Sequence, residues 1–202
     1  MKLALNKNSL KQQRDHLTMY RRFLPSLDLK RQQLMGAWKE SRQLLQEAED
    51  AEARYRQTLD QLLPLLGSST LQNRDLGSLI CVDKIVIEEE NIVGARVPVI
   101  RRIDFRRMAY STLVLPFWVD QLVDSLEQMT ESKLRVRVAR TRAARLATAV
   151  RKITQRVNLF EKVLIPSAQE NIRKIQISLA DEQRASVVRS KLAKQKRARE
   201  QV

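Results

Sequence analysis

One repeating pattern of apolar and polar positions runs through the first 66 residues. Counting from Leu34 in alternating steps of four and three residues reaches Leu34, Trp38, Ser41, Leu45, Ala48, Glu52, Tyr55, Leu59, Leu62 and Leu66. The same register extends backwards to Leu10. An apolar repeat of 3.5 residues held this long is typical of a coiled coil. We therefore predict one long helix over 1–66, kinked at Pro25 and ended by Pro64 and Gly67-Ser68-Ser69.

The middle of the chain changes to β-branched residues between about 80 and 105. Isoleucine and valine dominate, and the polar run Glu88-Glu89-Glu90-Asn91 interrupts them. This pattern predicts a small β-hairpin with a polar turn at that run. Because a lone hairpin is only marginally stable in water, we expect it to lie against a helix or a partner. Pro98 confines its strand to an edge. The hairpin would form a head region over 67–115.

A helical pattern returns near residue 116 and continues nearly to the end of the sequence. Heptad-compatible spacing is kept by Val119, Leu122, Leu126, Met129, Val136, Ala143, Ala147, Val150, Thr154, Val157, Phe160 and Leu164. Lys133 and Arg140 weaken this stripe, Pro166 is expected to break the helical hydrogen-bond ladder, and the charged last dozen residues are expected to fray. The helix at 116–202 would fold back on the first.

The predicted fold is therefore mainly α, with a long antiparallel two-helix coiled coil formed by the N- and C-terminal helices and a small head that contains a β-hairpin. The residues that we assign to the seam between the two helices are Leu34, Trp38, Leu45, Tyr55, Leu59, Leu62, Leu126, Val150, Val157 and Leu164.

Composition supports an elongated helical chain and points to an acidic partner. Aromatic residues make up only 4% of the 202 residues, there are four glycines, and charged residues reach 30%. The net charge is +15, from 38 Lys and Arg against 23 Asp and Glu. Such a chain suits nucleic acid, an anionic membrane surface or an acidic protein cavity. The densest basic run, Lys133 to Arg156, either contacts such a partner or pairs with acids on the opposite helix.

Few residues of the sequence could form a catalytic, cofactor-binding or metal site. The four glycines are too scattered for a phosphate-binding loop, and one histidine with one cysteine cannot make a structural zinc site. His16 lies in a polar helical stretch, which favours a structural or solvated role. Cys81 lies in an apolar run, so we expect it to be a small buried residue. We therefore expect no catalytic, cofactor-binding or metal site, and we interpret Glu88, Glu89 and Glu90 as a solvated turn.

The cellular setting follows from what the sequence lacks. A single cysteine cannot form an internal disulfide, which fits a reducing compartment. The first residues hold no apolar run long enough for a signal peptide, and no stretch approaches the roughly 20 apolar residues of a membrane-spanning helix. We expect a cytoplasmic protein without a transmembrane segment.

Several stretches of the chain carry motifs that occur together in one protein family. The stretch Arg156 to Pro166 is similar to the motif R-V-N-A-L-E-x-V-x-I-P, and Ile172, Ile175, Leu179 and Arg184 follow in the same order. Glu90 to Pro98 resembles a turn and strand with the pattern N-I-x-G-V-x-V-P, and Leu27, Lys30, Arg31 and Leu34 match the motif L-L-K-D-K-R-D-E-L. In this combination the chain resembles the D-subunit family of V-type and archaeal-type rotary ATPases. That family's small-Arg-Gly turn is replaced here by Arg22-Phe23-Leu24-Pro25-Ser26.

The resemblance implies a non-catalytic central-stalk subunit that turns as a rotor shaft between ATP hydrolysis or synthesis and ion transport. It implies four partners: the A and B subunits of the catalytic hexamer, the small F subunit of the stalk, and the C/d-type subunit that caps the membrane ring. It gives the head contacts to Asn91, Ile92, Val93, Gly94, Val97 and Pro98. The basic face toward the hexamer would hold Arg31, Arg151, Lys152 and Arg156.

Two alternatives share the helical rod. One is a nucleic-acid-binding protein that uses the arginine-rich run, although such proteins usually add aromatic stacking residues, which are missing from that run. The other is a generic coiled-coil scaffold, which lacks the hairpin motif. Rotor subunits of F-type ATPases also pair their terminal helices, but around a larger α/β middle.

Overall fold

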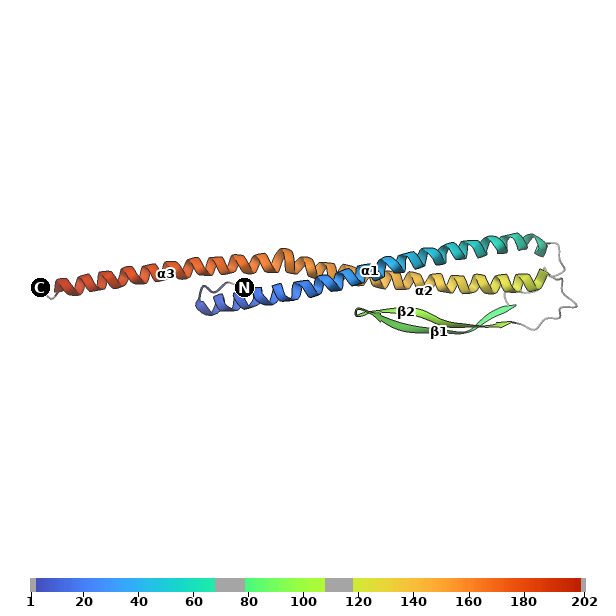
Figure 1. Cartoon of the computed structure of the whole chain (residues 1–202), viewed down its shortest axis with the longest axis horizontal. Helices are drawn as coiled ribbons and strands as arrows, with labels where there is room; N and C mark the ends of the chain where they lie inside the picture. Colours follow the sequence, from blue (N-terminus) through green and yellow to red (C-terminus); the bar gives the residue numbers. More distant parts are fainter. Residues whose placement is uncertain (1–2, 68–78, 108–117, 201–202) are drawn as a thin grey trace. The chain divides into compact units, whose positions relative to one another are not determined.

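The computed structural model describes residues 3–67, 79–107 and 118–200 and consists of long helices with one hairpin. Along the chain (Figure 1), the elements are α1 (Lys7–Gly67), β1 (Ile80–Ile92), β2 (Ala95–Arg107), α2 (Trp118–Leu159), the π-helical turn η3 (Phe160–Leu164) and α3 (Ile165–Glu200). The predicted mainly-α class, with a two-stranded antiparallel hairpin between an N-terminal and a C-terminal helix, is confirmed.

The chain divides into two compact units. The first combines Met1–Arg31 with Lys152–Val202, and the second is Gln32–Arg151. The first unit therefore pairs the start of α1 with the end of α2, η3 and α3. The second unit contains the rest of α1, the hairpin and most of α2. Each unit thus brings together segments that are far apart in the sequence.

Helix α1 starts at a side-chain cap. The Asn6 side-chain Oδ1 accepts a hydrogen bond of 2.7 Å from the backbone N–H of Ser9, which satisfies one of the free amides of the first turn. The helix passes through Pro25 and Pro64 without ending and stops at Gly67. Of the predicted stop signal, Ser68 and Ser69 lie outside the described residues.

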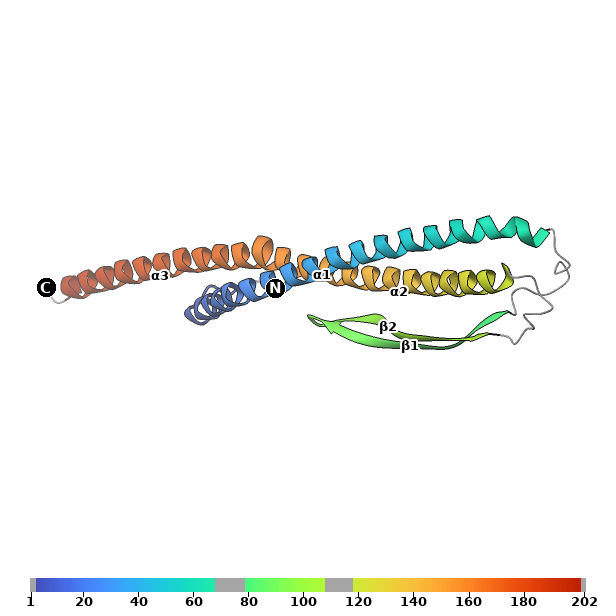
Figure 2. The same cartoon turned by 45° about the vertical axis from the view of Figure 1, so that its right-hand side comes forward.

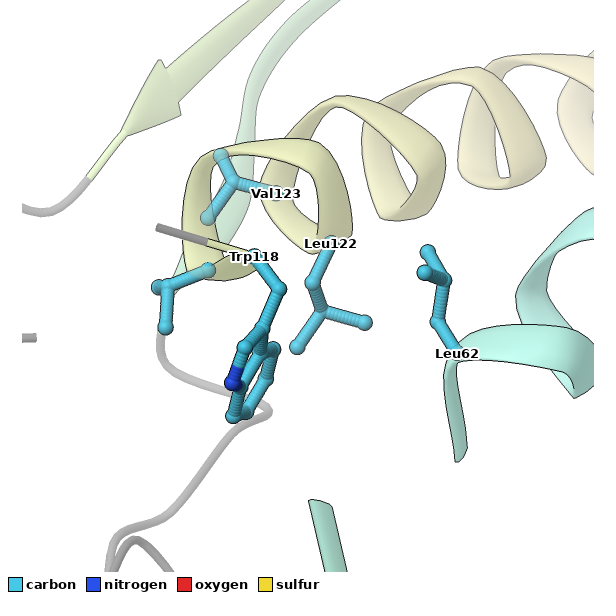
Figure 3. Packing of buried hydrophobic residues seen from close by; sticks show 5 residues of the cluster. Leu62, Trp118, Leu122 and Val123 are labelled. Atoms are coloured by element: carbon cyan, nitrogen blue, oxygen red, sulfur yellow. The ribbon is translucent and has the colours of Figure 1, made fainter. Parts of the chain in front are cut away.

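The second unit has a small apolar core where α1 and α2 meet. Leu62 of α1 packs against Trp118, Val119, Leu122 and Val123 at the start of α2 (Figure 3), and all five side chains are at most 7% exposed. Burying an aliphatic or aromatic side chain of this size stabilises a fold by roughly 1.5–3 kcal/mol. Leu79, Ile80 and Leu126 add a half-buried layer, so the base of the hairpin joins the same core.

The hairpin has a tight two-residue turn, and its position corrects the prediction from sequence. The strands pair from Ile92 with Ala95 out to Ile80 with Arg107, with irregularities near Asp83 and at Val86/Ile87. The turn lies at Val93 and Gly94, which have φ angles of 51° and 87°. The predicted turn at Glu88–Asn91 was wrong, because this run belongs to β1. Two successive positive φ angles suit glycine at the second position, and the Asn91 Oδ1 accepts a 2.8 Å bond from the Gly94 N–H.

The first unit is an antiparallel helix pair. Tyr20 of α1 meets Phe160 edge to face at 5.5 Å between ring centroids, and the Asn171 side-chain amide donates to the Gln13 side-chain oxygen at 3.4 Å. Ala168 and Ile175 of α3 are 3% and 0% exposed. The order of these contacts shows that α3 runs opposite to α1.

The regular hydrogen-bond ladder is interrupted next to Pro166, as the sequence predicted, but the chain stays helical on both sides. Pro166 follows η3, where the Ile165 N–H bonds to the Phe160 carbonyl, five residues back. A proline in a regular helix clashes with the carbonyl four residues before it. The wider turn leaves room for the ring, and helical structure continues into α3.

Replacing Leu34 by alanine should lower the free energy of unfolding by about 2–5 kcal/mol, because Leu34 is 2% exposed and its removal leaves a cavity. The matched control is Leu44→Ala on the same helix, since Leu44 is 45% exposed and should cost little. Urea unfolding followed by circular dichroism at 222 nm measures both. Equal effects of the two substitutions would contradict the placement of Leu34 in the core.

Replacing Val93 by asparagine should stabilise the hairpin, because a β-branched residue is strained at positive φ and asparagine tolerates it. Relief of about 1 kcal/mol would slow amide exchange in β1 and β2 roughly fivefold. Val93→Thr, which keeps the branched side chain, is the control and should change exchange little. Faster exchange in the asparagine variant would refute the assigned strain.

Candidate functional site

The described residues contain several charged and apolar surfaces. Among the described residues, no group of three or more His, Cys, Asp or Glu side chains is placed to hold a metal ion. His16 packs against Tyr20, with 6.0 Å between ring centroids. The prediction that Cys81 is buried was wrong: its side chain is exposed. Only one face of the two-stranded sheet packs against a helix, and its other face is open to solvent. An apolar run in such a strand therefore does not imply burial.

The first surface is formed by the hairpin, which ion pairs join to helix α2. In both views (Figures 1 and 2), α2 has α1 on one side and the hairpin on the other. At the open end of the hairpin, Arg107 bonds to Glu127 at 2.8 Å and to Asp124 at 3.0 Å. Its hydrogen bond to Glu127 is the main reason that the pKa of Arg107 is raised.

Two arginines of α2 hold the tip of the hairpin. Arg142 pairs with Glu90 at 3.2 Å, and Arg145 pairs with Glu89 at 3.1 Å. The Arg145 guanidinium also donates to the backbone carbonyl of Arg96 at 3.2 Å. Because a helix rises about 1.5 Å per residue, the stretch from Asp124 to Arg145 covers roughly 30 Å. The hairpin is therefore fastened along α2 at both of its ends.

The predicted contact residues at the tip divide into two groups. Val97 and Pro98 are buried, with Val97 0% exposed. Asn91 and Gly94 are exposed, while Ile92 and Val93 are half-buried. Val97 and Pro98 thus belong to the fold of this unit, and the exposed part of the tip is the turn itself.

Strand β1 presents apolar side chains to solvent. Val82, Ile85 and Ile87 are 38%, 37% and 51% exposed. Charged cross-strand pairs accompany them: Arg101 bonds to Glu88 at 2.7 Å, a hydrogen bond that raises the pKa of Arg101, and Arg106 pairs with Asp83. Exposed apolar side chains within a charged frame are a common feature of protein-binding surfaces.

The sequence allowed two roles for the basic run on α2: pairing with acids on the opposite helix, or contact with an acidic partner. Different residues of the run suit each role. Arg140 reaches Glu49 of α1 at 2.7 Å, and Arg135 pairs with Glu131 on its own helix. In contrast, the predicted basic-face residues Arg151, Lys152 and Arg156 are exposed, and none forms an ion pair with another described residue. The fourth, Arg31, is on α1 and bonds to Asp28.

The predicted seam residues differ in burial. Leu34, Leu62 and Val157 are at most 7% exposed. Half-buried positions are Trp38, Leu45, Leu59, Leu126, Val150 and Leu164. Tyr55 is 37% exposed and lines an open cavity of about 290 Å³ together with Ala48, Ala51, Gln128, Glu131, Ser132 and Arg135. Small side chains on both helices leave this gap. Seam assignment of these residues stays a prediction that the Leu34 variant tests.

Sequence reasoning missed residues whose partners come from another element. Leu146 and Ile153 are 0% and 5% exposed although the heptad register passed over them. In the second unit, which contains Leu146, α2 is covered by α1 and by the hairpin (Figures 1 and 2), so its buried face there is wider than a two-helix seam. Arg142 and Arg145 appeared only as members of a basic run. Their spacing of three places both on one helix face, but the sequence does not show that Glu89 and Glu90 lie opposite.

None of the helices in the described ranges is sufficiently long and apolar to cross a membrane.

Comparison with known proteins gives one consistent result. The family of ATP synthase D subunits matches residues 9–195. The V-type ATP synthase D subunit of Borreliella burgdorferi is 33% identical over 193 residues, covering 96% of this chain and 94% of the relative. The protein of the same name from Chlamydia muridarum is 32% identical over 196 residues, covering 96% and 95%. The chain therefore belongs to the ATP synthase D-subunit family.

Proposed function

We propose that this chain is the central-stalk subunit of a V/A-type rotary ATPase or ATP synthase and transmits torque without catalysing a reaction itself. The observation that carries the proposal is the family match over residues 9–195. Relatives named as D subunits of V-type ATP synthases, aligned over 96% of the chain, agree with it. The chain thus takes part in ATP synthesis or hydrolysis coupled to ion transport, while nucleotide and ion sites belong to other subunits.

The helix pairs suit a torque-bearing part. Interlocked side chains between two helices share a twisting load over many contacts. The antiparallel contacts within each unit, such as Tyr20 with Phe160 and Arg140 with Glu49, supply links of this kind. A shaft must also turn inside its bearing, so its outer contacts have to be weak and interchangeable.

The basic surface supplies such contacts. Exposed ion pairs contribute at most about 1 kcal/mol each. The exposed side chains of Arg151, Lys152 and Arg156 are available to acidic loops of a hexamer built from A and B subunits. With a net charge of +15, the chain as a whole favours an acidic cavity.

The hairpin is the proposed docking surface for the small F subunit of the stalk. It is fastened to α2 at both ends and presents Val82, Ile85 and Ile87 to solvent. The ring-capping C/d-type subunit is the further partner of this head region, 67–115. The protein would act in the cytoplasm as a peripheral part of a membrane-associated complex.

The proposed role predicts ATP-driven rotation. Cys81 is the single cysteine and is exposed, so a biotin–maleimide group there can carry a bead without further engineering. With A/B hexamers fixed to a glass surface, the bead should turn in one direction when ATP is added and stop when ATP is removed. Hexamers that hydrolyse ATP while the bound bead only fluctuates would contradict the role as a rotor.

The hairpin assignment predicts that replacing Ile85 and Ile87 by serine weakens binding of the purified F subunit at least tenfold. The lost apolar contact of two side chains would account for this change. The matched control replaces Val187 and Val188 by serine, because they are similarly exposed but lie on α3. Isothermal titration calorimetry measures both affinities. Unchanged affinity in the Ile85/Ile87 variant, with the hairpin still folded, would rule out this docking surface.

A further inference from the structure

The hairpin has two outer edges, and only one of them faces helix α2. The Arg145 guanidinium of α2 donates to the backbone carbonyl of Arg96 in β2, so the outer edge of β2 is the one beside the helix. In Figures 1 and 2, the half of β1 nearest the turn lies on the side of β2 away from α2. The outer edge of β1 therefore faces away from the helix.

The two-residue turn fixes which backbone groups of β1 point outward. In such a hairpin the pair next to the turn, Ile92 with Ala95, is hydrogen-bonded, and hydrogen-bonded and non-hydrogen-bonded pairs then alternate along the strands. In a non-hydrogen-bonded pair, the N–H and C=O groups point away from the neighbouring strand. Ile87, Glu89 and Asn91 occupy these positions in β1.

Two observations on β2 agree with this register. Pro98 pairs with Glu89, and proline, which has no N–H, fits a strand where no ladder bond is required of it. Arg96 pairs with Asn91, and its carbonyl accepts the bond from Arg145. The outer edge of β2 therefore lacks a donor at one position and has an acceptor occupied at another.

The outer edge of β1 has neither restriction between Lys84 and Ile92. This stretch contains no proline, and the extra residue that makes a bulge in β1, Asp83, precedes it. Within the described part of the chain, no backbone group of another element bonds to this edge. Proteins usually protect a free edge with proline, a bulge or a covering helix, because such an edge pairs readily with another strand. This regular, unprotected edge is therefore suited to receive one.

The side chains along the edge define which kind of strand fits. Ile85 and Ile87 are 37% and 51% exposed on one face of β1, so an added strand needs apolar side chains at alternate positions. Lys84 is exposed on the other face, and Asp104 opposite it bonds to Arg102 instead. A carboxylate on that face of the added strand would pair with Lys84.

The acidic residues of β1 do not require a basic partner strand, because each is already paired with an arginine of β2 or α2. The pairs are Asp83 with Arg106, Glu88 with Arg101, Glu89 with Arg145 and Glu90 with Arg142. The occupant that fits is therefore an amphipathic strand with an acidic residue, and not a cationic segment.

We propose that the outer edge of β1 receives an extended segment of the small F subunit, which adds a third strand to the sheet. The inference rests on the proposed docking of F at the hairpin and specifies how F is held. The edge is continuous with the exposed apolar side chains assigned to F, so one partner can use both. Main-chain bonds to Ile87, Glu89 and Asn91 would supply affinity, and the alternating side chains would supply specificity.

Residue-resolved amide exchange by NMR on the full chain, with and without purified F subunit, tests the added strand. In the chain alone, the outward amides of Ile87, Glu89 and Asn91 should exchange rapidly, whereas the amides of Glu88 and Glu90 face β2 and should be protected. Addition of F should slow exchange of the three outward amides by roughly tenfold or more, because they gain acceptors. Bound F that leaves these three amides unchanged would overturn the proposal.

A proline substitution tests the same edge by affinity. Glu89→Pro removes one outward N–H without removing a ladder bond, as Pro98 does on the neighbouring strand. It should weaken F binding by roughly tenfold or more. Glu89→Ala is the matched control: it loses the same ion pair with Arg145 but keeps the N–H, and it should change affinity by less than about threefold. Isothermal titration calorimetry measures both variants.

Equal affinities of the proline and alanine variants, with the hairpin still folded, would also overturn the added strand. If Glu89→Pro opens the hairpin, the exchange experiment on the original chain decides the question. Protection of the outward amides in the chain alone, with a dimer in sedimentation velocity, would make a second copy the occupant and contradict the choice of F.

These outcomes separate the added strand from the proposed function. Binding of F that depends on Ile85 and Ile87 but leaves the outward amides unprotected would keep the docking surface and remove the strand. Absence of any F binding would remove both. ATP-driven rotation tests the rotor role independently of either result.

Discussion

The structure depends on the narrowness of the surface that two paired helices can bury. Each level of such a pair hides only a few side chains, so no single compact core can support the chain. Leu34, Val157 and Ile175 are nearly inaccessible, while most other inward positions are half-buried. Stability must come from many modest contacts, which a chain with 4% aromatic residues can supply.

In the second unit, the hairpin adds a third layer to the two helices and increases the buried area. The hairpin lies on α2 opposite α1, and the cluster around Leu62 and Leu122 gathers residues next to the base of the hairpin. The hairpin in turn gains from α2 the support that two isolated strands lack. Ion pairs at its tip and base fix its position, and each is partly exposed, so each contributes little alone.

The limited area that this fold buries also determines which side chains are exposed on the functional surfaces. Apolar side chains of β1 remain exposed because the hairpin has only one covered face, and a partner can use them. Cations that meet no acid within the described part of the chain, such as Lys152 and Arg156, remain available to an external acidic surface. Arg140, Arg142 and Arg145 are used internally. The position of the nearest carboxylate therefore decides which cations of the basic run pair inside the chain and which stay available to a partner.

The sequence alone determined the helices, the hairpin and the family, because periodicity, β-branched composition and motif order are local properties. It placed Leu34, Leu62 and Val157 on apolar stripes, and these three side chains are buried in the structure. Tertiary structure decided the rest. Strand pairing moved the turn to Val93–Gly94, and the single covered face of the sheet exposed Cys81. The fold of the hairpin onto α2 brought Glu89 and Glu90 to Arg145 and Arg142. The physical reason is that a side chain's environment depends on which distant segment covers it, and no local pattern encodes that choice.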